Sequence, residues 1–204
     1  MDPDNQTTPD EDLARQGRAG SLAAFEKLVR RYERRIYSFA ARCCGSAEDA
    51  AEITQDTFVK AYQALNQFDA GRNFGTWLFT IARRKCIDRR RTAGPAPAEM
   101  PELMEPDNPA EKLVREEDAA AIWSRAARLL PPNQFQALWL RYVEDMTVAE
   151  VARVLRKTRT HVKVLLFRAR RTLARHLSSE APQTASAADF RPLGLGIPRR
   201  EQPL

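Results

Sequence analysis

The sequence predicts an all-α protein in which two small helical domains are joined by a flexible acidic linker. Two observations support this prediction: apolar residues recur at the i, i+3, i+4, i+7 spacing of amphipathic helices, and two strongly basic blocks flank an acidic, Pro-rich segment. The length of 204 residues is sufficient for one or two such domains.

The N-terminal residues 1–14 are acidic and are predicted to be disordered. They contain neither the basic region nor the apolar stretch of a signal peptide, and the chain has no run of about 18 apolar residues. We therefore expect a cytoplasmic protein with no membrane insertion.

The first domain, residues 15–93, is predicted to contain three helices. The first helix has an apolar stripe over residues 25–40. The second follows a break at Gly45, and either Ser46 or Asp49 can serve as its N-cap. Four polar side chains lie outside its apolar face: Glu52, Gln55, Asp56 and Lys60.

A loop that contains Gly71 and Gly75 precedes the third helix, in which Trp77 is expected to belong to the core. The opposite side of this helix carries a row of cations: Arg83, Arg84, Lys85, Arg89, Arg90 and Arg91. Such a row is typical of a helix that binds nucleic acid.

Residues 94–118 are predicted to be the linker, because 2 basic and 8 acidic residues and several prolines leave little apolar surface to offset the entropy lost on folding. Residues 119–179 form the second basic domain, with 12 basic and 3 acidic residues. The Pro-containing tail, residues 180–204, is expected to be disordered.

Within the second domain, residues 147–171 predict a helix-turn-helix. Thr147 and Glu150 have the spacing of a capping box, and Thr158 offers an N-cap for a second helix. That helix is surrounded by cations and no acidic residue occurs from Ala152 through Ser179, which fits the major groove of DNA. The alternative is a solvated basic face on an ordinary bundle, but such faces usually mix both signs of charge.

The other residue types indicate no catalytic chemistry. Cys43, Cys44 and Cys86 lack metal-ligand spacing, and we interpret them as small apolar side chains rather than as a redox switch or a metal site. His161 and His176 lie among arginines. Because no Cys/His cluster, phosphate-binding loop or Ser/His/Asp set can be assembled, we expect no enzyme, cofactor or metal.

The order of these motifs resembles the extracytoplasmic-function (group IV) sigma factors of bacterial RNA polymerase. The resemblance runs from about Ser21 to His176 and rests on the segments AEDAAEITQDTFVKAYQAL, FGTWLFTIARRKCIDRRR and LLPPNQFQALWLRYVEDMTVAEVARVL. It implies a sigma domain two that binds core RNA polymerase and the minus-ten promoter element, and a sigma domain four that binds the minus-thirty-five element. The family acts in stress responses, and an anti-sigma factor often restrains its members.

The resemblance also implies roles for individual residues. On the segment EITQDTF, the residues expected to bind core polymerase are Glu52, Gln55 and Asp56. The expected DNA-binding residues on the minus-ten side are Arg72, Asn73, Arg83, Arg84, Lys85, Arg89 and Arg90. Those on the minus-thirty-five side are Arg156, Arg159, Thr160, His161, Lys163, Arg168 and Arg171. For loop 69–73, base capture and a plain turn are equal alternatives.

The second domain departs from the family pattern at two places. Arg156 stands where glycine is common, which costs about 1 kcal/mol if the turn needs a left-handed residue; the side chain can instead reach a phosphate. Val164 and Leu165 replace polar residues. Either base preference is altered, or a surplus apolar face packs on a protein partner.

Two other classes of function remain open. A two-module repressor or activator would bind duplex DNA unaided, but it has no need of the acidic face on the second helix. An adaptor would use its helices only for protein contacts, but it has no need of the polybasic third helix. We therefore expect a sigma factor that assists transcription initiation.

Overall fold

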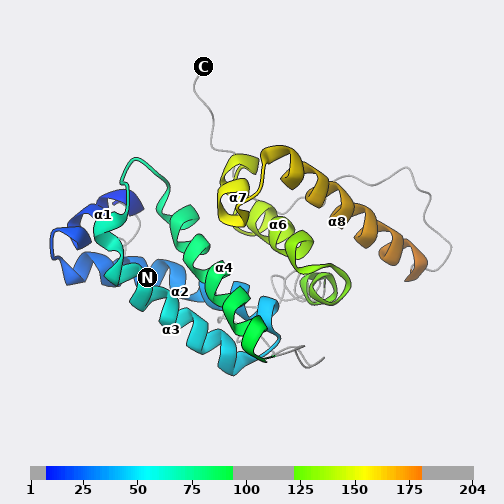
Figure 1. Cartoon of the computed structure of the whole chain (residues 1–204), viewed down its shortest axis with the longest axis horizontal. Helices are drawn as coiled ribbons and strands as arrows, with labels where there is room; N and C mark the ends of the chain where they lie inside the picture. The colour runs from blue at the N-terminus through cyan, green and yellow to red at the C-terminus, as the bar shows by residue number, and fades with distance from the viewer. Residues whose placement is uncertain (1–7, 94–121, 181–204) are drawn as a thin grey trace, which may run out of the picture.

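The computed structural model describes residues 8–93 and 122–180, and every regular element in these ranges is helical (Figure 1). Residues 122–129 are also helical. The labelled elements, in chain order, are α1 (Asp10–Arg18), α2 (Leu22–Cys44), α3 (Ala47–Gln63), a short 3-10 helix (Leu65–Gln67), α4 (Phe74–Ala93), α6 (Pro132–Tyr142), α7 (Val148–Leu155) and α8 (Arg159–Glu180). The all-α prediction is confirmed.

Local signals in the sequence set the helix ends in the first half. The Ser21 hydroxyl accepts from the Ala24 N–H and caps α2, which ends where Gly45 takes a left-handed φ of 73°. Of the two candidate caps for α3, Ser46 is used: its hydroxyl accepts from the Asp49 N–H. The Asp49 carboxylate is thereby left for another partner.

The prediction that residues 1–14 are disordered is wrong from Asp10 onward, because α1 begins there. The acidic side chains of its first turn stabilise the helix, because they lie at the positive end of its dipole. Leu13 is buried. Asp10 accepts from Arg31 and from the Tyr32 hydroxyl, at 2.6 Å from the latter. Glu11 accepts from the Phe74 N–H at 3.1 Å. These acids hold α1 against α2 and the start of α4.

Helices α1 to α4 surround an aromatic core. Phe39 on α2 meets Phe79 on α4 with ring centroids 5.5 Å apart, and Tyr32 meets Phe74 at the same distance. Both contacts are edge-on, the arrangement that aromatic quadrupoles favour. Trp77 is only half-buried, and it packs on Phe68 and Phe74 at the edge of this core.

The second half is the predicted helix-turn-helix packed against α6. The Thr147 hydroxyl accepts from the Glu150 N–H, and the Glu150 carboxylate accepts from the Thr147 N–H, so the capping box is confirmed. Thr158 caps α8 by accepting from the His161 N–H at 3.2 Å. Aromatic side chains pack around α6: the ring centroid of Trp139 lies 5.2 Å from that of Trp123 and 5.9 Å from that of Phe135.

The two halves pack against each other, mainly through α4 on α7 and α2 on α6. Their buried side chains form one continuous apolar cluster. Polar contacts also cross the junction: Arg35 on α2 pairs with the buried Glu144 at 2.7 Å, and Arg83 on α4 donates to the Gln136 side chain at 2.9 Å. The predicted linker 94–118 and the tail beyond Glu180 lie outside the described residues.

Candidate functional site

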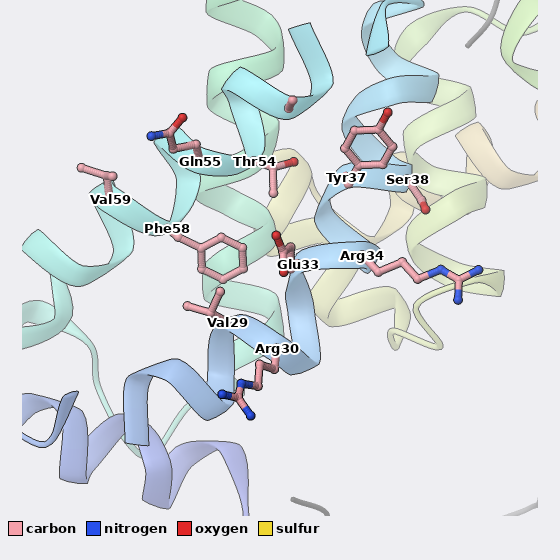
Figure 2. A pocket seen from close by; sticks show the side chains of 11 residues that line it. Val29, Arg30, Glu33, Arg34, Tyr37, Ser38, Thr54, Gln55, Phe58 and Val59 are labelled. Carbon is pink, nitrogen blue, oxygen red and sulfur yellow. The ribbon is translucent and has the colours of Figure 1, made fainter. Parts of the chain in front are cut away.

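A groove runs between α2 and α3, lined by side chains of both helices (Figure 2). Val29, Phe58 and the half-exposed Val59 supply its apolar surface. Arg30 and Arg34 lie on the α2 side, and Gln55, an expected polymerase-binding residue, lies on the α3 side. Sequence reasoning identified Gln55 but missed the groove, because α2 and α3 each show a separate pattern along the chain.

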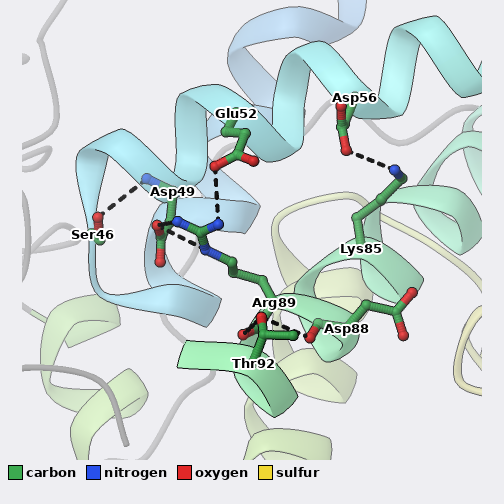
Figure 3. A network of polar contacts seen from close by, with 8 residues as sticks. All are labelled: Ser46, Asp49, Glu52, Asp56, Lys85, Asp88, Arg89 and Thr92. Atoms are coloured by element: carbon green, nitrogen blue, oxygen red, sulfur yellow. Dashed lines mark hydrogen bonds and ion pairs between the residues drawn. The ribbon is translucent and has the colours of Figure 1, made fainter. Parts of the chain in front are cut away.

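The acidic face of α3 pairs with cations of α4 (Figure 3). The Lys85 ammonium lies 2.6 Å from the Asp56 carboxylate, and Arg89 reaches Glu52 at 3.1 Å. Arg89 also donates through Nε to Asp49 at 3.0 Å. This hydrogen bond, with the nearby charges, raises the pKa of Arg89. Two expected polymerase contacts therefore lie beside two expected DNA contacts, a pairing the sequence did not reveal.

The other cations of α4 point in different directions. Arg83 is half-buried and turns toward the second half, where it also donates to Asn133 at 3.3 Å. Burial lowers the pKa of Arg83, and the charge of Arg156 acts in the same direction. Arg84 and Arg90 are exposed. The expected minus-ten cations of α4 thus form three groups rather than one row. Lys85 and Arg89 pair with acids of α3, Arg83 turns toward the second half, and Arg84 and Arg90 are exposed.

A cleft beside α4 brings cations of both basic blocks together. Arg84 and Lys85 line it from α4, and Arg156 lines it from the second half. Trp77 forms part of the same wall. These cations are far apart in the sequence and meet only because α4 packs against α7.

The loop before α4 is held by Asp69, whose carboxylate accepts from the Gly71 N–H at 3.0 Å and pairs with Arg72 at 3.1 Å. The Asn73 side-chain oxygen accepts from the Thr76 N–H at 2.8 Å and from the Thr76 hydroxyl. That oxygen caps α4, so the group of the Asn73 side chain that can bind the edge of a base is its NH2 group, as a hydrogen-bond donor.

The expected DNA-facing side chains of the helix-turn-helix are all exposed: Arg156, Arg159, Thr160, His161, Lys163, Arg168 and Arg171. Arg156 has φ 52° and ψ 49°, the left-handed conformation considered from the sequence. Leu165, which we considered for base contact, is 7% exposed and belongs to the core. Among the α8 side chains that the structure describes, the large apolar ones that are exposed are Val164 and Phe167, at 40% and 58%. Because helical spacing puts Leu165 on the inner face, the pair that can touch a ligand is Val164 and Phe167.

Comparisons with known proteins decide the family. Residues 28–95 match the model "Sigma-70 region 2", and residues 121–173 match "Sigma-70, region 4". The chain belongs to the extracytoplasmic-function sigma factors. The sigma factor is 33% identical to ECF RNA polymerase sigma factor BldN of Streptomyces coelicolor over 83% of its own length and 66% of that relative's. It is 31% identical to SigM of Mycobacterium tuberculosis, with 78% and 80% of the two chains covered.

A solved structure shares the fold of this sigma factor. CnrH, solved in complex with the cytosolic domain of CnrY, superposes with a TM-score of 0.65 at 29% identity, and the match covers 84% of this chain and 99% of CnrH. The region 2 match begins at Leu28 within α2 and includes α3 and α4, and the region 4 match includes residues 122–129, α6, α7 and α8 as far as Leu173. Within the described residues, no helix is both long and apolar enough to cross a bilayer.

Proposed function

We propose that this sigma factor binds core RNA polymerase, directs it to specific promoters and assists promoter melting in the cytoplasm, with no catalytic step of its own. The domain boundaries that we propose are residues 15–93, extended by α1, and residues 119–179. The main support is that this chain has both an exposed acidic face on α3 and exposed cations on α4 and α8. Polymerase and phosphate backbone require surfaces of these two kinds.

Helix α8 would read the minus-thirty-five element. Its N-terminal end presents Arg159, Thr160 and His161 to solvent, the end from which a recognition helix reaches base edges. Val164 and Phe167 lie one turn apart on the same exposed surface and can contact thymine methyl groups. We infer a preference for thymine at one or two positions of this element.

Helix α4 and the loop before it would contact the minus-ten element. Arg84 and Arg90 are exposed and can contact phosphates, and the Asn73 amide group can donate to an unstacked base. Lys85 and Arg89 must exchange their carboxylate partners for phosphates. Because these ion pairs are partly exposed, the exchange costs little.

The decisive test is a permanganate footprint of a cognate promoter with and without core polymerase. We expect unpaired thymines only when both proteins are present. The double variant Glu52→Lys/Asp56→Lys should lose polymerase binding with its helical content intact. Melting by the sigma factor alone would instead favour a DNA-binding regulator that acts without polymerase.

Charge reversal at Glu52 and Asp56 also breaks their ion pairs with α4, so the test needs a further variant that leaves these ion pairs intact. Gln55 is exposed on the same face, and Gln55→Lys should weaken polymerase binding in the same direction. Gln16→Lys, at an exposed glutamine of α1, makes the same change of charge and should behave as wild type. Normal polymerase binding by all the α3 variants would contradict the proposed interface.

We further propose that a protein partner with the role of an anti-sigma factor docks in the groove between α2 and α3. CnrH has a protein partner in its own structure. The apolar groove flanked by Arg30 and Arg34 would suit an amphipathic helix with acidic side chains. Val59→Arg should raise transcription from the target promoters in the native cell, because it blocks the groove. Leu22→Arg, at an exposed apolar residue that does not line the groove, is the control.

A further inference from the structure

The first helix, α1, lies outside the residues that match the family. The region 2 match begins at Leu28, whereas α1 ends at Arg18. The helix nevertheless packs on α2, on the 3-10 helix and on the start of α4 (Figure 1). Loop 69–73, which we propose for base contact, joins the 3-10 helix to α4. Helix α1 thus contacts the elements at both ends of this loop.

Glu11 forms the direct link between α1 and the loop. Its carboxylate accepts a hydrogen bond from the Phe74 N–H at 3.1 Å. Phe74 is the first residue of α4, so this N–H has no acceptor within its own helix. The N–H belongs to the planar peptide group that joins Asn73 to Phe74, and the hydrogen bond therefore fixes the backbone on one side of Asn73.

The side chain of Asn73 is fixed as well. Its oxygen accepts from the Thr76 N–H at 2.8 Å and from the Thr76 hydroxyl at 3.1 Å. The Asn73 carbonyl accepts from the Trp77 N–H at 3.3 Å. Asn73 is nevertheless exposed, so its NH2 group can reach a base. Together with Glu11, these bonds give that donor a defined orientation before DNA binds, which reduces the entropy lost on binding.

A second acid of α1 supports the same turn of α4. Asp10 accepts from the Tyr32 hydroxyl at 2.6 Å and pairs with Arg31. The Tyr32 ring meets Phe74 edge-on, with centroids 5.5 Å apart. At Gly75, a Cβ atom would lie 3.0 Å from the Tyr32 hydroxyl oxygen, so the backbone of α4 fits closely against this side chain. Asp10 thus holds the start of α4 through Tyr32, and Glu11 holds it directly.

We propose that Glu11 is a positioning residue for promoter opening. It fixes the first turn of α4 and thereby orients the Asn73 amide toward an unstacked base of the minus-ten element. Glu11 stays on the Phe74 N–H and does not contact DNA, because its carboxylate would repel a phosphate. This role rests on the proposed function, since the orientation of Asn73 matters only if Asn73 contacts the promoter.

The first measurement is hydrogen exchange of the Phe74 amide, followed by NMR on the full-length sigma factor. Glu11→Ala should exchange faster on the order of tenfold, because it loses a hydrogen bond to a charged acceptor. Asp12→Ala is the matched control. It removes the same charge from the same turn, but Asp12 pairs with Arg15 in its own helix at 2.8 Å. This variant should exchange as the wild type does.

The second measurement is the rate at which the complex with core polymerase opens a cognate promoter, followed by permanganate reactivity. Glu11→Ala should lower this rate on the order of tenfold, with polymerase binding unchanged. Glu11→Gln should recover most of the rate, because its amide oxygen can still accept from the Phe74 N–H. Asp12→Ala should open the promoter at the wild-type rate. Circular dichroism checks that each variant keeps its helical content.

A double variant separates the orientation of Asn73 from a general loss of stability. Asn73→Ser keeps an oxygen that can cap α4 but removes the NH2 donor. In this background Glu11→Ala should lower the opening rate no further, because the group that Glu11 orients is gone. An equal loss in that background would overturn the proposal, as would wild-type opening by Glu11→Ala or wild-type exchange at Phe74.

Failure of the proposed function gives a different result. In that case the wild-type sigma factor itself opens no promoter with polymerase, and the role of Glu11 falls with it. If the wild type opens the promoter and Glu11→Ala opens it equally well, only the role of Glu11 is wrong.

Discussion

Arg156 connects backbone conformation to stability at the scale of one residue. Its left-handed φ of 52° brings a Cβ atom close to the following carbonyl oxygen. We predict that Arg156→Gly is more stable than Arg156→Ala by about 1 kcal/mol in free energy of unfolding. Both variants lose the same cation, so urea denaturation of the pair measures the backbone effect alone. Equal stability of the two variants would show that this turn carries no strain.

Sequence reasoning at this scale succeeds where the partners are local. The caps at Thr147 and Thr158 depend on atoms three residues away, so their spacing predicts them. The choice of Ser46 over Asp49 could not be predicted, because Arg89 occupies the Asp49 carboxylate from another helix. Helical spacing predicts that Phe167 is exposed, but a pattern of apolar residues does not indicate that such a large exposed ring is available for binding.

At the scale of the element, α8 should account for much of the binding to duplex DNA. We predict that the triple variant Arg159→Ala/Lys163→Ala/Arg168→Ala weakens binding. Each lost phosphate contact should also lower the slope of log affinity against log salt by about 0.9. Anisotropy titrations across a salt series provide the measurement.

The control removes three exposed cations elsewhere, with Arg15→Ala/Arg18→Ala/Arg30→Ala on α1 and α2. This variant has the same net charge as the α8 variant. A similar loss of slope in both variants would mean that overall charge, and not α8, determines the affinity.

The ion pairs between α3 and α4 predict competition between polymerase contact and DNA contact. Asp56→Asn releases Lys85, so we expect non-specific DNA affinity to rise by up to about fivefold, the range of a partly exposed pair. Asp88→Asn removes an equal charge from an exposed site on α4 and serves as control. If both variants gain the same affinity in the titration, the local pairing has no separate effect.

At the scale of the whole molecule, Glu144 joins the two halves. Its side chain is 1% exposed, pairs with Arg35 and accepts from the Trp139 indole N–H at 3.2 Å. We predict that Glu144→Ala costs about 2 kcal/mol in free energy of unfolding, because it leaves both donors without this acceptor; the figure allows for the partial exposure of Arg35. Glu144→Gln keeps an acceptor and should cost less. Urea denaturation at neutral pH compares the two variants.

The same carboxyl predicts a pH dependence. Burial raises the pKa of Glu144 above its ordinary value of 4.5, although the Arg35 charge opposes the shift. The folded state therefore holds this proton more tightly than the unfolded state, so the contribution of Glu144 to stability falls as pH rises from 4.5 through the raised pKa. Glu144→Gln lacks this decline, so the stability of the wild type minus that of the variant should fall as the pH rises through this range. A difference that does not vary with pH would contradict the raised pKa.

Sequence reasoning was least complete at this largest scale. Periodicity and charge predicted two helical units, and the comparisons confirm the sigma-factor family. The docking of α1 was missed, because an acidic segment of low hydrophobicity is stabilised here by Arg31 and Tyr32 on another helix. The packing of α4 on α7 was missed for a similar reason, since contacts between distant segments leave no pattern along either one.

The continuous apolar core across both halves has a calorimetric consequence. If α4 and α7 share one buried cluster, heating should produce a single endotherm whose calorimetric and van't Hoff enthalpies agree. A promoter that needs the two helices apart would then capture only the small population in which they have separated. Its apparent dissociation constant is the intrinsic one divided by that population.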